Sequence, residues 1–192
     1  MKVAFVVYDG LTALDFVGAY DPITRVGTMG FRDDLVWEVC GLSSTVTATG
    51  GLTIETTATD ESLAGYDLVF VPGGIGTTLP AEDHPVVSLL RSAADCRYKA
   101  SVCTGALLLA AAGLLEEHRA TTHPGAYDAL TERATVTERR VVRDGDVITG
   151  GGVSSALDVG LYIAELLTDA ETRRRITSQM DYPYYHDYTG MA

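Results

Sequence analysis

Residues 66–74 read YDLVFVPGG, and this stretch decides the fold. It contains one charged residue, and four apolar residues run consecutively from 68 to 71. A run of this length predicts a strand that is buried on both faces. The Pro-Gly-Gly that follows predicts that the strand ends in a turn. A strand buried on both faces needs helices above and below it, which indicates an α/β architecture.

The chain on either side of this strand alternates between short apolar runs and helical patterns. We expect further strands at 2–8, 35–40, 100–102, 135–137, 141–143 and 147–149, and a hairpin formed by 46–49 and 52–55. We expect helices at 12–26, 86–94, 105–112, 154–167 and 169–176. The alternation predicts a mostly parallel central sheet in a single domain over residues 1–192. Sites in such sheets lie beyond the carboxyl ends of the strands.

Composition narrows the classes of function. Fourteen basic and 26 acidic residues give a net charge of −12, while the apolar fraction is an ordinary 46%. Nucleic acid and anionic membranes attract clustered Lys and Arg, so neither is expected as a partner. The basic cluster at 173–175 lies among acidic residues. No apolar run approaches the ~18 residues that a membrane span needs.

The cysteine and histidine patterns give no sign of a metal. Cys40, Cys96 and Cys103 are odd in number and show no C-x-x-C spacing, which argues against a disulfide framework and a thiolate zinc site. No H-E-x-x-H or H-x-x-x-H pattern occurs. We therefore expect a cytoplasmic protein that needs neither a metal nor an organic cofactor.

Cys103 is the strongest candidate for chemistry. It lies in ASVCTGA (100–106), where an expected strand passes through one residue into a helix. This is the sequence form of a nucleophile elbow, a sharp turn that pushes the central side chain outward. The N-terminus of the following helix favours a thiolate, so a lowered thiol pKa is expected. Most free cysteines are buried and structural, and Cys40 and Cys96 keep that interpretation.

The glycines of VPGGIGT (71–77) form the second candidate. Glycine lets the backbone approach a ligand and direct N–H groups at an anion. The phosphate-binding patterns G-x-x-x-x-G-K-[ST] and G-x-G-x-x-G are absent. An oxyanion hole fits better, with the amides of Gly74 and Thr104 facing one developing charge. A plain tight turn is the alternative.

Asp15 and His123 are candidates with competing interpretations. Thr12-x-x-Asp15 is like a capping box, so Asp15 is either a helix cap or a general acid or base beside the thiol. His123, in RATTHP (119–124), is a candidate base for a Cys–His pair, and no acid that would orient it is evident.

Together these motifs resemble the ThiJ/PfpI superfamily, whose fold is like that of class I glutamine amidotransferases. The matching stretches are KVAFVVYDGLTALDF (2–16), DLVFVPGGIG (67–76), VCTGALLLAAAGLL (102–115), RATTHP (119–124) and VITGGGVSSALD (147–158). The C-T-G at Cys103 with the N-terminal L-D looks like the isonitrile hydratase branch. Protease-like members carry His where this chain has Thr104. Relatives commonly have Trp where this chain has Pro124.

The resemblance implies a flavodoxin-like three-layer sandwich, a homodimer, and a hydratase that converts an isonitrile to an N-substituted formamide. In this hypothesis Cys103 attacks the small electrophilic substrate, Asp15 donates a proton, and the amides of Gly74 and Thr104 stabilise charge. The Thr104 hydroxyl orients Asp15 or water. Two alternatives stay open: a cysteine hydrolase or carbonyl-adduct repair enzyme, and a non-catalytic redox- or ligand-sensing domain.

Overall fold

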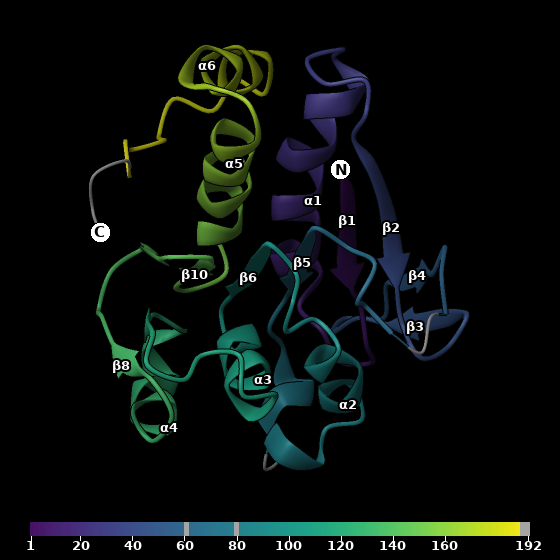
Figure 1. Ribbon diagram of the computed structural model, residues 1–192, viewed down its shortest axis with the longest axis vertical. Helices are drawn as coiled ribbons and strands as arrows, with labels where there is room; N and C mark the ends of the chain where they lie inside the picture. Colours follow the sequence, from purple (N-terminus) through teal and green to yellow (C-terminus); the bar gives the residue numbers. More distant parts are fainter. Residues whose placement is uncertain (60–61, 79–80, 189–192) are drawn as a thin grey trace.

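The structure of the protein, a computed structural model, describes residues 1–59, 62–78 and 81–188. Helices cover both faces of a six-stranded sheet (Figure 1). The strands of this sheet are β1 (Lys2–Val6), β2 (Val36–Cys40), β5 (Leu68–Val71), β6 (Tyr98–Val102), β9 (Val141–Asp144) and β10 (Val147–Gly150). The helices are α1 (Ala13–Thr28), α2 (Val86–Arg91), α3 (Gly105–Ala111), α4 (Tyr127–Thr131), α5 (Ser155–Leu167) and α6 (Ala170–Gln179).

The main sheet has the strand order β2-β1-β5-β6-β10-β9. The first five strands are parallel to their neighbours, and β9 pairs antiparallel with β10. When the five parallel strands are numbered along the chain, their order across the sheet is 2-1-3-4-5, which is the flavodoxin-like arrangement. The expected α/β fold with a mostly parallel sheet is confirmed. The carboxyl ends of the parallel strands lie at one edge of the sheet. The loops that follow β1, β5, β6 and β10 therefore lie at that edge.

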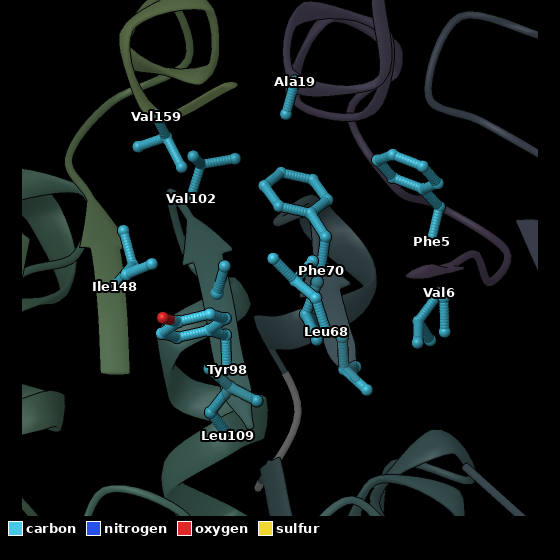
Figure 2. Packing of buried hydrophobic residues seen from close by; sticks show 14 of the residues in the cluster. Phe5, Val6, Ala19, Leu68, Phe70, Tyr98, Val102, Leu109, Ile148 and Val159 are labelled. Carbon is cyan, nitrogen blue, oxygen red and sulfur yellow. The ribbon is translucent and has the colours of Figure 1, made fainter. Parts of the chain in front are cut away.

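Close helix packing closes one face of the sheet, where α1 lies beside α5 (Figure 1). A Cβ added at Gly18 would lie 2.8 Å from the Ala156 side chain, and one at Gly160 would lie 2.9 Å from the Ala19 backbone. Small residues at this crossing therefore let the two helices approach. Figure 2 shows Phe70 among the apolar side chains between the strands and these helices. In the described ranges, no helix has both the length and the apolar character needed to cross a membrane.

The short elements differ most from the expectations. The hairpin of β3 (Thr45–Thr47) and β4 (Thr53–Glu55) is confirmed. The strand expected at 135–137 is β8 (Thr135–Val136), which leaves the main sheet and pairs with β7 (Arg119–Ala120). Neither β7 nor α4 was expected, because two strand residues and five helix residues are too few to show a period.

Candidate active site

Cys103 lies between β6 and α3, at the carboxyl edge of the sheet. Its φ is 54°, a left-handed value that is strained for a side chain with a Cβ. The Cys103 N–H donates to the carbonyls of Gly150 and Gly151 at 3.0 and 2.7 Å, and the Cys103 carbonyl accepts from Thr122 Oγ1 at 2.8 Å. These bonds hold the strained turn that the sequence predicted.

Two glycines let the turn after β5 press against this elbow. A Cβ at Gly73 would lie 2.5 Å from the Thr104 nitrogen and 2.8 Å from the Cys103 Cβ. A Cβ at Gly105 would lie 2.3 Å from the Val71 carbonyl oxygen. All three separations are shorter than a real Cβ tolerates, so the contact between the two loops requires glycine at both positions.

Asp15 faces this junction from the first turn of α1 and is fully buried. Its Oδ2 accepts from the Gly73 N–H at 3.1 Å, whereas Oδ1 has no hydrogen-bond partner of normal geometry. The Thr12 side chain makes no capping hydrogen bond. The capping-box interpretation is therefore wrong: the carboxyl points across to the turn after β5.

Asp15 and Cys103 interact electrostatically. Burial raises the pKa of Asp15 to about 6, although hydrogen bonds from the Cys103 thiol and the Gly73 N–H lower it. Burial, and then the Asp15 charge, raise the pKa of Cys103 to about 11, while the Thr104 N–H acts in the opposite direction. Of the two groups, Asp15 therefore ionises first as the pH rises, and burial together with the Asp15 charge favours the protonated form of the Cys103 thiol.

The expectation of a lowered thiol pKa is wrong. The sequence argument rested on the dipole at the start of α3, which has seven residues. Burial of Cys103, which is 6% exposed, and the negative charge of Asp15 outweigh that dipole.

Thr104 connects the elbow to the glycine turn through its hydroxyl. Thr104 Oγ1 accepts from the Gly74 N–H at 3.1 Å and lies 2.5 Å from Thr77 Oγ1. Thr77 Oγ1 also donates to the Gly74 carbonyl at 2.7 Å. The Gly74 amide, expected in an oxyanion hole, is thus occupied by Thr104, while the Thr104 amide is directed at the sulfur. Thr77 was missed because its contact with the elbow is to Thr104, 27 residues away, whereas its bond to the Gly74 carbonyl is a local turn contact.

A cavity of about 700 Å³ opens beside the elbow, with Thr104, Leu107 and Thr77 in its wall. Cys103 precedes Thr104 in the chain and is not itself among the residues that line the cavity. His123 also lines the cavity, and it is exposed, with Nδ1 accepting from the Gly125 N–H at 3.1 Å. No contact joins His123 to Cys103 in the described part of the chain, so the structure does not bring the candidate Cys–His pair together.

A metal site needs several ligating side chains close together. Across residues 1–59, 62–78 and 81–188, no group of three His, Cys, Asp or Glu side chains is placed to hold a metal ion. The three cysteines are all free thiols.

The fold and these groups define a class of protein: an α/β domain with a cysteine on a nucleophile elbow and a buried carboxyl beside it. Residues 1–166 match the model of the DJ-1/PfpI family, and the chain belongs to this family. Isonitrile hydratase from Pseudomonas putida is 37% identical over 184 residues, which cover 95% of this chain and 78% of the hydratase.

Other relatives show the breadth of the family. The transcriptional regulator CdhR from Pseudomonas aeruginosa is 32% identical, and the match covers 82% of this chain and 48% of the regulator. The crystal structure of a ThiJ/PfpI family protein from Pseudomonas syringae superimposes with a TM-score of 0.83 at 31% identity, covering 100% of this chain and 78% of that protein. The resemblance seen in the sequence motifs is confirmed.

Proposed function

We propose that the protein hydrates an isonitrile to an N-substituted formamide, with Cys103 as nucleophile and Asp15 as proton carrier. The observation that carries this proposal is the fully buried Asp15 carboxyl, which the Gly73 N–H holds beside the strained Cys103 elbow while Oδ1 has no hydrogen-bond partner. The 37% identity to a hydratase of this class supports the choice of substrate.

The first half of the reaction adds the thiol across the terminal carbon of the isonitrile. Asp15 accepts the Cys103 proton as the sulfur bonds to that carbon, and then delivers the same proton to it. The product is a thioimidate, Cys103–S–CH=N–R, and no redox change occurs. Because the thiol begins protonated, Asp15 needs no proton from solvent for this half.

The second half consumes one water. Asp15 removes a proton from water as the oxygen adds to the thioimidate carbon, and passes that proton to the imine nitrogen. Asp15 then takes the hydroxyl proton of the tetrahedral adduct as the carbonyl forms and the C–S bond breaks. It returns this proton to the Cys103 sulfur, and the N-substituted formamide leaves. The Thr104 amide, already directed at the sulfur, stabilises the thiolate as it departs.

The cavity beside Thr104 would hold the substituent on nitrogen. Leu107 and Ala129 provide apolar wall, and Glu82 and Arg133 form an ion pair at the same cavity. We therefore expect neutral alkyl or aryl isonitriles to be preferred over charged ones.

The test is formamide production from a small alkyl isonitrile by the purified protein in D₂O. The mechanism requires the formyl carbon to carry deuterium, since its hydrogen comes from the exchangeable thiol. Cys103→Ala and Asp15→Asn should each lose at least about 10²-fold in rate, in the range expected for acid–base catalysis. Cys96→Ala is the matched control and should keep full activity. Absence of turnover by wild-type protein would refute the proposal.

A ligand-sensing role is the competing proposal, and the regulator that is 32% identical over 82% of this chain supports it. In that case an isonitrile, or another small electrophile, binds in the cavity without being converted. Saturable binding with no formamide would favour this role. The hydrolase or repair alternative is less well supported, since Thr104 follows the cysteine and His123 stands apart from it.

We further propose a cytoplasmic homodimer. Leu14 and Val17, on one face of α1, are 45% and 41% exposed, and a second copy would cover them. Three free thiols fit a reducing compartment. Light scattering after gel filtration tests the dimer, and Leu14→Glu should shift the protein towards monomer. A monomeric wild-type protein would contradict the dimer.

A further inference from the structure

Tyr8 is a buried phenol that no motif identified. It lies two residues beyond β1 and is 6% exposed. Its hydroxyl donates to the carbonyl of Pro72 at 2.7 Å. The Tyr8 ring makes an edge contact with the ring of His84, with 4.7 Å between centroids. The ring is therefore held in place while the hydroxyl reaches the turn after β5.

The carbonyl that Tyr8 binds belongs to the same peptide unit as the N–H that holds Asp15. The Pro72 C=O and the Gly73 N–H flank one peptide bond, and the Gly73 N–H donates to Asp15 Oδ2 at 3.1 Å. The hydrogen bonds thus run in sequence from the Tyr8 hydroxyl through this peptide to the carboxyl. A donor on the carbonyl polarises the peptide and strengthens its N–H as a donor.

We propose that Tyr8 is a positioning residue for Asp15, acting through the peptide bond between Pro72 and Gly73. It orients the peptide plane and stabilises the carboxylate, so that Asp15 accepts the thiol proton. This inference rests on the proposed role of Asp15 as proton carrier. Tyr8 is not among the residues that line the cavity beside Thr104.

The electrostatics of Tyr8 agree with this role. Burial, and then the charges of Asp15 and Cys103, raise the pKa of Tyr8 well above its ordinary value. Tyr8 therefore remains a protonated donor throughout the working pH range. The Gly73 carbonyl accepts from the Thr12 N–H at 2.8 Å, so Gly73 is also held to the start of α1 through its carbonyl.

The test is the titration of Asp15 in Tyr8→Phe by carbon-detected NMR, with the Asp15 signal assigned by its absence in Asp15→Asn. Loss of the phenol weakens the Gly73 N–H as a donor, so the Asp15 pKa should rise by about 0.2 to 0.7 pH unit. Tyr66→Phe is the matched control, because it removes another buried phenol whose hydroxyl is hydrogen-bonded with Cys40 and Glu38. An unchanged Asp15 titration in folded Tyr8→Phe would overturn the inference.

A second variant keeps the test decisive if Tyr8→Phe does not fold. Fluorotyrosine at position 8 is a stronger hydrogen-bond donor, so it should lower the Asp15 pKa, and no shift would count against the inference. Neither titration needs substrate, so both stand whether or not isonitrile is converted. If the protein converts isonitrile, the acid limb of the pH–rate profile should move with the Asp15 pKa in both variants. In Tyr8→Phe, kcat should fall while KM stays constant.

Discussion

Burial of Asp15 gives the carboxyl its reactivity and also weakens the fold. The folded-state pKa of about 6 lies above the ordinary value of 3.8, so the folded state favours the protonated form. The resulting stabilisation is complete below about pH 4 and is lost as the pH rises through 6. Above that pH the fold contains a buried charge that a neutral side chain would avoid.

Asp15→Asn should therefore stabilise the protein at high pH. A rise of about two pH units in pKa corresponds to at most about 3 kcal/mol, so the free energy of unfolding at pH 8 should increase by up to that amount. Urea unfolding at pH 8 and at pH 4 measures the effect. The gain should nearly vanish at pH 4, where Asp15 is protonated in wild type as well. Equal effects at both pH values would contradict this reasoning.

The Thr104 hydroxyl should matter through its hydrogen bonds rather than its bulk. Thr104→Val leaves the Gly74 N–H without its acceptor and Thr77 Oγ1 without its 2.5 Å neighbour. We expect kcat/KM to fall by about 10- to 100-fold, the result of losing one or two hydrogen bonds. Thr104→Ser retains the hydroxyl and should keep most of the activity. Similar losses in both variants would show that the methyl group matters instead.

The sequence identified Cys103 and Asp15 but not what connects them. The elbow is a local pattern, since strand, cysteine and helix are consecutive. Whether Asp15 capped its own helix or faced Gly73, 58 residues away, could not be decided from local spacing. Tyr8 acts through a carbonyl that is 64 residues away in the sequence. Thr77 reaches the elbow through a contact 27 residues away, and its bond to the nearby Gly74 carbonyl does not reveal that role. The predicted direction of the Cys103 pKa shift was wrong, because burial of the thiol depends on tertiary packing that the local sequence does not show.

At the level of elements, the site is a contact between two turns, one after β5 and one after β6. Strands with apolar runs were predicted well, because four or five buried residues in succession leave a clear pattern. The short elements β7 and α4, which lead into the wall of the cavity, left none. The sequence therefore predicted the scaffold of the site better than its cavity.

Gly73→Ala tests the contact between the two turns. The new Cβ would meet the Thr104 nitrogen at 2.5 Å, and because this atom is backbone, the elbow must move. We expect a loss of about 1–3 kcal/mol in the free energy of unfolding, typical of overpacking, together with loss of activity. Gly65→Ala is the matched control, since a Cβ there meets no atom within 4 Å. Denaturation midpoints and rates of the two variants measure the difference, and equal midpoints would contradict the close contact.

At the level of the whole molecule, an ion pair between the buried Asp158 and the partly exposed Arg140 joins three parts of the chain. Asp158, in the first turn of α5, is fully buried, and its Oδ2 accepts from Arg140 Nε at 2.7 Å and from the Tyr182 hydroxyl at 3.2 Å. Arg140 also donates to the Ser154 carbonyl at 2.9 Å. These bonds therefore hold together the segment before β9, the start of α5 and the chain after α6.

Replacing Arg140 alone should destabilise the protein more than replacing both Arg140 and Asp158. Arg140→Met leaves the Asp158 carboxylate buried without its cation, and we expect a loss of about 2–4 kcal/mol, below the fully buried range because Arg140 is 40% exposed. Arg140→Met with Asp158→Asn removes both charges and should recover most of that loss. Urea unfolding of the two variants measures the difference, and since neither residue lines the cavity, kcat in the folded double variant should equal that of wild type. If the single and double variants are equally unstable, the buried charge is not the cause.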